Sequence, residues 1–234
     1  MYFPRNHGPL LSVLLPSRAR VPWLINACNS LYATAIDRHN VEIIVKLDDD
    51  DQPSLDAAPY LPPRTKVVVT PRGNGYPDMP RWLNEMLPRA TGEWVLGFND
   101  DAFMWTHGWD ELLATLDPRR DPNWRGSPGV CLLNCADSEG KPTTVLPFVR
   151  RAACEYLGHI SLNAHFDTWL QEVYSPLGAV HAVPEIRIHH HYHKPDGPFP
   201  FSVVAGTTSY PDLISEESKA ARARDTEKLR SIII

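Results

Sequence analysis

Short apolar segments alternate with amphipathic stretches in the first half of the chain, and this alternation restricts the fold more than any other feature. The apolar segments have the length and the Val, Ile and Leu content of β-strands, and they cover residues 10–15, 41–47, 65–72 and 93–98. The amphipathic stretches have helical spacing and cover residues 21–34 and 81–90. Strands separated by helices pair in parallel. The pattern therefore predicts an α/β fold with a mostly parallel central sheet flanked by helices.

Polar and charged residues follow each of these predicted strands directly. They are Pro16 to Arg20, Asp48 to Asp51, Arg72 to Gly75 and Asn99 to Asp101. Because the carboxyl ends of parallel strands lie at one edge of a sheet, ligands bind there. We therefore expect one ligand site built from these loops. The adjacent carboxylates of Asp100 and Asp101 need a cation, a ligand or open water to offset their charge.

The second half of the chain is less regular. Its predicted elements are a short helix at 109–116, a strand at 129–136, an amphipathic helix at 166–177 and a polar surface helix at 215–231. A chain of 234 residues can bury a full core, and the usual domain sizes favour one large domain.

Charge and cysteine usage predict a cytoplasmic protein. The net charge of -5 gives no electrostatic footprint for nucleic acid, although a local basic groove within an acidic protein is not excluded. The four cysteines do not form the pattern of a secreted disulfide scaffold, and the N-terminus lacks the features of a signal peptide. The longest apolar stretches are shorter than the roughly 20 residues that cross a bilayer, so we expect no membrane anchor.

Four motifs in this order resemble the glycosyltransferases of the GT-A fold, in particular the large inverting group called family 2. The first two are "LPSRAR" after the first strand and "VEIIVKLDDDD" at the second. The third, "LNEMLPRATGEWVLGFNDDA", is similar to the helix and strand that lead into the metal motif of that family. The fourth is "HFDTWLQEVYSPLG", followed by "IRIHHHYH". The resemblance covers roughly residues 10 to 193 and implies a GT-A-like (Rossmann-like) single domain.

The resemblance implies a metal-dependent, inverting transfer of a sugar from a nucleoside diphosphate to an acceptor hydroxyl. Asp101 would bind Mn²⁺ or Mg²⁺, and Asp167 would act as the general base. A histidine would complete the metal site; we favour His191 over the alternatives His189, His190 and His193. The chain departs from the family pattern at Asn99, where the first carboxylate of the metal motif is an amide. It also departs at Phe166, where glutamate is more common.

The same resemblance assigns the donor site. Asp48 or Asp50 would accept a hydrogen bond from the base, arginines would bind the diphosphate, and Asp100 would accept from sugar or ribose hydroxyls. The full set of expected donor-binding residues is Pro16, Ser17, Arg18, Arg20, Asp48, Asp50, Arg72, Asn84, Asn99 and Asp100. A UDP-sugar is the favoured donor, although a carboxylate also suits the edges of cytosine and guanine.

Structural interpretations compete with each of these assignments. Acidic runs are usually solvated loops, an Asp-Asp pair can be a capped turn, and Asp167 can cap a helix. The histidines with Cys131 and Cys135 invite a zinc site, but both thiols lie on a predicted strand and are expected to fill core. "GNGYPD" lacks the third glycine of a dinucleotide fingerprint, so a Rossmann cofactor site is not expected.

Two other functions remain open from the sequence. A nucleotidyltransferase uses a similar platform, but "LPSRAR" lacks the glycines of its signature loop. A non-catalytic nucleotide-sugar-binding module is the other, and Asn99 is the residue that favours it. The acceptor is undetermined among a glycan, a protein, a lipid-linked saccharide and a hydroxymethylated DNA base. We expect a domain at 1–210, with a donor half at about 10–110 and an acceptor half at about 111–210, followed by a polar helix or tail at 211–234.

Overall fold

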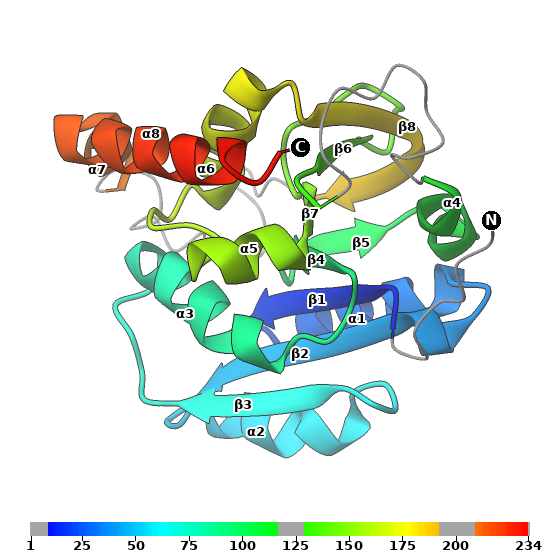
Figure 1. Cartoon of the computed structure of the whole chain (residues 1–234). Helices are drawn as coiled ribbons and strands as arrows, with labels where there is room; N and C mark the ends of the chain where they lie inside the picture. The colour runs from blue at the N-terminus through cyan, green and yellow to red at the C-terminus, as the bar shows by residue number, and fades with distance from the viewer. Residues whose placement is uncertain (1–8, 117–128, 192–208, 234) are drawn as a thin grey trace.

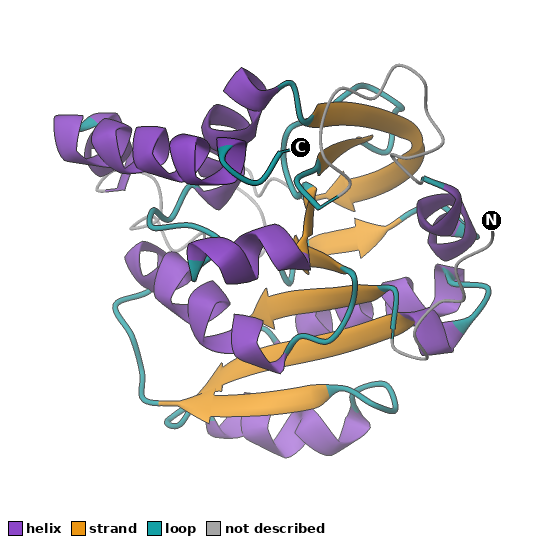
Figure 2. Ribbon diagram, in the orientation of Figure 1, coloured by secondary structure: helices purple, strands orange, loops and turns teal. Residues whose placement is uncertain are grey.

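The computed structural model describes residues 9–116, 129–191 and 209–233. Within these residues, eight strands form one sheet in the order β3-β2-β1-β4-β7-β6-β8-β5 (Figure 1). Helices cover both faces of the first four strands, with α3 and α5 in front and α1 and α2 behind (Figure 2). The predicted α/β architecture is therefore confirmed.

Four parallel strands form the first half of the sheet, as the alternating pattern predicts. They are β1 (Leu11–Pro16), β2 (Val41–Asp48), β3 (Lys66–Thr70) and β4 (Trp94–Gly97). β1 pairs with β2 on one side and with β4 on the other, so Leu11 lies opposite both Val41 and Trp94. Every residue of β1, β2 and β4 is buried because helices cover both faces, which explains why these strands are mostly apolar, although β2 also buries Glu42 and Lys46.

The second half of the sheet is mixed: it contains one further parallel pair, and its other pairs are antiparallel. β7 (Phe148–Arg150) is antiparallel to both β4 and β6 (Leu132–Ala136). β8 (Val180–His190) runs parallel to β6, and β5 (Ala102–Met104) pairs antiparallel with the end of β8. β5 and β7 have three residues each, too few for a hydrophobic period to appear in the sequence.

Five helices lie close to their predicted positions. They are α1 (Val21–Thr34), α3 (Met79–Met86), α4 (Trp109–Thr115), α6 (Phe166–Tyr174) and α8 (Glu216–Arg230). Three further helices are not predicted from the sequence: α2 (Gln52–Ala57), α5 (Arg151–Leu157) and α7 (Ser209–Ile214). No helix of the described residues is long and apolar enough to cross a membrane.

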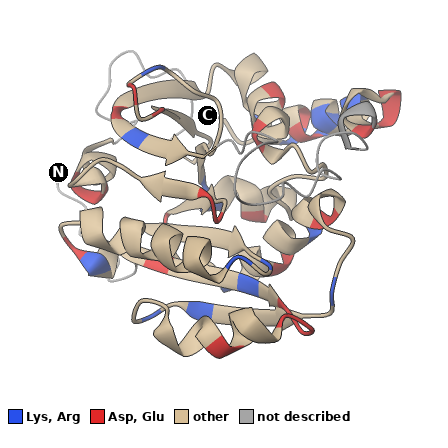
Figure 3. Ribbon diagram, turned by 180° about the vertical axis from the view of Figure 1, so that it is seen from behind, with Lys and Arg blue, Asp and Glu red and all other residues tan. Residues whose placement is uncertain are grey.

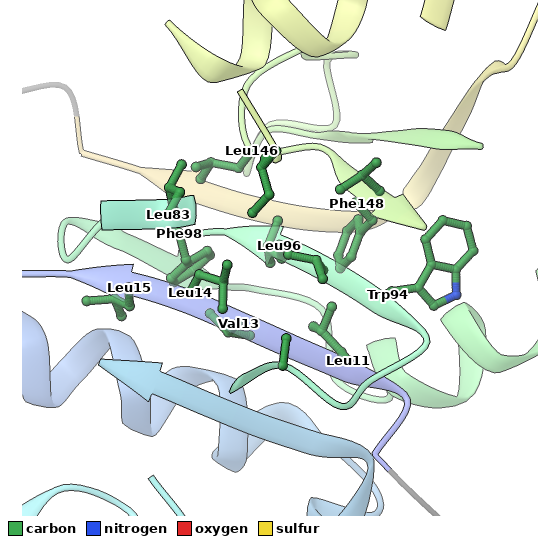
Figure 4. Close-up of a cluster of buried hydrophobic side chains, with 14 of the residues drawn as sticks. Leu11, Val13, Leu14, Leu15, Leu83, Trp94, Leu96, Phe98, Leu146 and Phe148 are labelled. Carbon is green, nitrogen blue, oxygen red and sulfur yellow. The ribbon is translucent and has the colours of Figure 1, made fainter. Parts of the chain in front are cut away.

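The core joins the two halves of the sheet. Side chains of β1 and β4 meet Leu146 and Phe148 from the second half (Figure 4). Cys131 and Cys135 are buried free thiols in this core, and burial raises the pKa of Cys135 to about 12. Both cysteines therefore fill core, as expected, and are not available to a zinc site.

The C-terminal helix forms as predicted and also contributes to the folded unit. α8 packs beside α6 (Figure 1), with Leu229 fully buried. The Arg222 guanidinium lies over the Trp169 ring and forms a 2.6 Å ion pair with Glu172. The polar composition of this segment hides its contact face, because that face is made partly of charged side chains with apolar stems.

Candidate active site

The loops that follow β1 and β4 meet at one edge of the sheet, where they bury the Asp100 carboxylate. Asp100 is 6% exposed, and its Oδ1 lies 2.7 Å from Arg20 Nη1. The Ser17 hydroxyl donates to Asp100 Oδ2 at 2.7 Å. Burial raises the pKa of Asp100 to about 6, although Arg20 and Ser17 act in the opposite direction. The carboxylate is therefore mainly ionised at neutral pH, with Arg20 as its counterion.

Asp101 lies next to Asp100 and contacts a histidine from the far end of β8. Its Oδ1 is 3.1 Å from His190 Nε2, and its Oδ2 is 3.4 Å from Arg20 Nη2. Burial opposes ionisation of Asp101, but His190 and Arg20 outweigh it and lower the pKa of this carboxyl. Arg20 thus lies between the two adjacent carboxylates and offsets charge that the sequence alone left unexplained.

The loop after β1 is held by the acidic loop after β2. The Ala19 backbone has a positive φ of 54°, and its N–H donates to the Asp51 carboxylate at 2.7 Å. Figure 3 shows acidic residues in the loops at this edge, with basic residues close to them. A non-glycine residue in the left-handed region is strained, so the Asp51 contact stabilises a loop shape that the chain does not prefer locally. This shape presents Arg18 and Arg20 on either side.

The carboxylates at the end of β2 and in the loop after it form a series of ion pairs with neighbouring basic side chains. Asp48 is buried and pairs with both Lys46 and Arg18, the latter at 2.9 Å. Arg18 also binds Asp50 through both of its terminal nitrogens, and Arg72 lies 3.5 Å from the same carboxylate. Lys46 is only 1% exposed, with its ammonium 4.2 Å from the centre of the Trp82 ring. The buried Lys46 fixes Asp48, whereas Arg18, Asp50 and Arg72 form the accessible rim.

A cavity of about 160 Å³ opens beside Asn99 and His190. Its lining also includes Tyr76, Asp167 and the ring of Phe166. Asp167 lies in the first turn of α6, where its Oδ1 accepts from the Thr168 N–H at 2.8 Å. Burial and the nearby Asp167 charge raise the pKa of Tyr76 to about 12, so its phenol remains a hydrogen-bond donor at neutral pH. Asp167 therefore lines the same cavity as His190, the histidine that contacts Asp101.

Gly97 sets the distance between α6 and the sheet. A Cβ added at Gly97 would lie 2.9 Å from the Phe166 ring, which is the residue next to Asp167. We expect Gly97→Ala to lower the free energy of unfolding by about 1–3 kcal/mol, because the close packing leaves no room for a methyl group. Chemical denaturation measures this change. Gly129→Ala is the matched control, since a Cβ there has nothing within 4 Å. An equal, small loss in both variants would contradict the packing interpretation.

Most of the predicted donor residues gather at this edge. Their contacts with one another join Ser17, Arg18, Arg20, Asp48, Asp50, Arg72, Asp100 and Asp101, with Pro16 at the end of β1 and Asn99 3.1 Å from His190. Asn84 has a different environment. Its Oδ1 accepts from the Ile160 N–H and its Nδ2 donates to the Ser161 carbonyl, each at 2.8 Å. Its geometry supports a role in holding the loop before α6 rather than in contacting a donor.

The structure brings the His190 ring, rather than that of the favoured His191, to the Asp101 carboxylate, whereas His191 donates its backbone N–H to the Asp101 carbonyl at 2.9 Å. The His191 ring lies against Trp23 and Phe103, with ring centroids 5.2 and 5.5 Å away, and His193 lies outside the described residues. Alternation along an extended segment separates His190 from its two neighbours but does not say which set faces the site. That choice depends on the pairing of Ala102 with His190 across β5 and β8. Tyr76 and Lys46 are further site residues that the sequence did not single out.

A divalent cation fits this site only if the protein and the diphosphate of a substrate bind it together. The described residues hold no group of three or more His, Cys, Asp and Glu side chains arranged around one point. Asp101 Oδ1 and His190 Nε2 do face each other and supply an oxygen and a nitrogen donor. Mg²⁺ and Mn²⁺ are commonly bound through one or two carboxylates, with substrate phosphates and water completing the shell. The donor set therefore fits an ion that arrives with a diphosphate.

Solved structures share this fold. No protein-family model and no curated protein matches the chain. Mannosyltransferase PcManGT from Pyrobaculum calidifontis, in complex with GDP-Man and Mn²⁺, is 20% identical with a TM-score of 0.59, over 80% of this chain and 58% of that one. S. aureus TarS 1-349 in complex with UDP is 14% identical with a TM-score of 0.60, over 79% of this chain and 61% of that one.

These matches confirm the GT-A fold that the sequence motifs predict. A TarS structure with UDP-GlcNAc has the same relation to this chain, at 13% identity and a TM-score of 0.59. The chain spans about three fifths of the length of these proteins. At this identity the likeness shows the fold and does not extend to the reaction.

Proposed function

We propose that this protein is a glycosyltransferase that moves a sugar from a nucleoside diphosphate to an acceptor hydroxyl, with inversion. One observation carries the proposal. His190 and Asp167 line one cavity at the sheet edge, and the His190 ring contacts Asp101, which in turn lies beside Arg20 of the loop after β1. The bound GDP-Man, UDP and UDP-GlcNAc of the structural neighbours support a nucleotide-sugar donor.

The donor would lie along the loops after β1, β2 and β4. Asp48 or Asp50 would meet the base and Arg18 the diphosphate, which requires Arg18 to exchange its contacts with these carboxylates. Arg20 keeps Asp100 and Asp101 ionised and adds positive charge beside the phosphates. UDP remains the favoured nucleotide, with GDP as the alternative.

Asp101 and His190 would hold Mn²⁺ or Mg²⁺ together with the diphosphate. When bound, the ion acts as a Lewis acid that stabilises negative charge on the leaving diphosphate. Asp167 would take the proton of the acceptor hydroxyl as its oxygen bonds to the anomeric carbon. The bond from that carbon to the diphosphate oxygen breaks, and the diphosphate leaves with the electron pair. Attack from the face opposite the leaving group inverts the anomeric centre.

A thermal-shift screen tests the proposed function. The samples are UDP-, GDP-, CMP- and dTDP-sugars, each with Mn²⁺, Mg²⁺ or EDTA. We expect one nucleotide sugar to raise the melting temperature by several degrees in the presence of the ion, since a ligand at 100 times its dissociation constant adds about 2.7 kcal/mol to the free energy of unfolding. Slow hydrolysis of that donor would separate an enzyme from a binding module. Absence of a shift with every nucleotide sugar would contradict the proposal.

The two adjacent histidines provide a sharp test of the metal site. We expect His190→Ala to weaken Mn²⁺ binding in the presence of UDP or GDP by at least about tenfold, because even residues that only support a metal ligand change affinity by 10–100-fold. His191→Ala should leave Mn²⁺ binding unchanged, since its ring faces Trp23 and Phe103. Electron paramagnetic resonance of free Mn²⁺ measures both. The reverse result would restore the sequence-based choice of His191.

A further inference from the structure

A row of aromatic rings lies on the outer face of the β5–β8 pair. Neighbouring ring centroids are 4.3–5.8 Å apart, and the row consists of Trp23, Phe103, His191, His189 and Trp105. Phe103 pairs with His189 across the two strands, whereas Ala102, Met104 and Ile188 occupy the alternate, buried positions. The row therefore lies on the side of these strands that faces away from the core.

Trp105 is an exposed member of this aromatic row. Its side chain is 60% exposed, and it adjoins the His189 ring at a centroid distance of 5.8 Å. The Trp105 backbone N–H donates a hydrogen bond to the Arg187 carbonyl at 2.9 Å, which anchors this residue. Trp23 and Phe103 help to pack α1 against β5, but packing of the fold does not account for a large exposed indole at the end of the row.

A second cavity, of about 200 Å³, lies at the same end of the row. Its polar lining residues are Asp137, Ser138, Glu139, Thr143, His189 and His190. The His189 Nδ1 is 2.7 Å from the Ser138 hydroxyl, so the ring is held between this cavity and Trp105. His190, Val145 and Leu146 line both this cavity and the one that contains Asp167. A ligand in the second cavity therefore adjoins the proposed reaction centre.

The polar groups of the second cavity suit hydroxyls rather than anions. The described residues that line it include two carboxylates but no lysine or arginine. Asp137 Oδ1 accepts the backbone N–H groups of Glu139 and Lys141, and Lys141 pairs with Glu139 on the exposed side of the turn. The Arg187 guanidinium packs against Gly140 of the same turn and does not line the cavity. A phosphorylated or carboxylated chain would meet acidic side chains inside the cavity.

We propose that the acceptor is an uncharged saccharide of at least two sugar units. One unit occupies the second cavity and directs its hydroxyl toward Asp167, and the next unit stacks on Trp105. Sugar rings present hydroxyls at their edges, which pair with carboxylate, hydroxyl and imidazole groups. Their faces are largely C–H, which an aromatic ring shields from water. The role of the saccharide as acceptor rests on the proposed function, whereas its binding at this surface does not.

Calorimetry and ligand-observed NMR with neutral oligosaccharides test the assignment. The probes are malto-, cello-, manno- and chito-oligosaccharides of one to six units. We expect the affinity in at least one series to rise from one sugar unit to two or more. Trp105→Ala should lower this affinity by about tenfold, because the variant loses the indole surface that the bound sugar would cover. Tyr60→Ala is the matched control, because Tyr60 is 77% exposed and lies between α2 and β3, the strand at the other end of the sheet from β5.

Three outcomes would overturn the assignment. They are no binding in any series at millimolar concentration, binding that Trp105→Ala leaves unchanged, and binding of the single-stranded DNA (dT)₁₀ at this surface in place of the saccharides. Thermal shifts with nucleotide sugars on the same samples keep the two proposals apart. Donor binding without saccharide binding refutes only the acceptor assignment. Saccharide binding that depends on Trp105 without donor binding refutes only the proposed transfer reaction.

Discussion

Replacing Asp167 with asparagine is expected to lower turnover by about 10²–10⁴-fold, the usual contribution of a general base. Asparagine has the same shape and keeps the carbonyl oxygen that accepts the Thr168 N–H, so the first turn of α6 should be preserved. It cannot take the proton of the acceptor hydroxyl. Steady-state kinetics with the donor found in the thermal-shift screen gives the turnover number, and calorimetry gives the donor affinity, which should change by less than about twofold.

A matched control for Asp167→Asn is available on the same helix. Glu172→Gln removes one negative charge from α6, where Glu172 pairs with Arg222 on the side facing α8. Glu172 is half exposed whereas Arg222 is buried, and the glutamine keeps an oxygen that can accept from the Arg222 guanidinium, so the fold should be preserved. Normal turnover in Asp167→Asn would remove Asp167 from the mechanism and leave it as a helix-capping residue. A similar fall in both variants would instead point to a general effect of charge or of the position of α6.

Replacing Asp101 with asparagine is expected to abolish the dependence of nucleotide binding on Mn²⁺ and to lower turnover by about 10³-fold, since metal stabilisation of a leaving diphosphate contributes several kcal/mol. The variant keeps an oxygen near His190 but loses the charge that pairs with Arg20 and would bind the ion. Titration of UDP or GDP in Mn²⁺ and in EDTA measures the first effect. Affinity should be the same in both conditions for the variant.

The acidic loop after β2 supplies the control for Asp101→Asn. Asp49→Asn removes a carboxylate from an exposed position at the same sheet edge. The Asp49 carboxylate accepts a hydrogen bond from the Arg72 backbone N–H at 3.2 Å. The variant should retain metal-dependent binding. Wild-type turnover of Asp101→Asn in Mn²⁺ would argue against a metal site at this position. Equal losses in the two variants would indicate that net negative charge at the edge, rather than ligation by Asp101, is what matters.

The first half of the fold was accessible from the sequence because its signals are local and long enough to read. β1 and β2 are mostly apolar and rich in Val, Ile and Leu, and α1 has a helical stripe of buried side chains, including Leu24, Cys28 and Leu31. The three-residue strands β5 and β7 left no such signal, so the mixed half of the sheet was missed. Their places in the sheet depend on partners far away along the chain, Arg150 with Trp94 and Ala102 with His190.

The candidate site was predictable in its location but not in its pairings. Strand alternation placed Ser17, Arg20 and Asp100 at one edge, and the structure joins all three. It could not show that Arg20 is the counterion of both carboxylates. Nor could it show that Asn84 is used to hold backbone groups before α6. Such pairings depend on side-chain directions across loops, which local propensity does not encode.

The sequence by itself determined the fold class, the edge at which polar loops gather and the candidate carboxylates Asp101 and Asp167. The fold class and the edge follow from hydrophobic periodicity and from the rule that parallel strands end at one edge. The two carboxylates are implied by the resemblance of their motifs to those of the GT-A glycosyltransferases. Only the tertiary structure decided which histidine meets Asp101, since the antiparallel register of β5 against β8 turns His190 inward and His189 and His191 outward. A shift of one residue in that register would exchange the two faces, which is why a local pattern could not settle it.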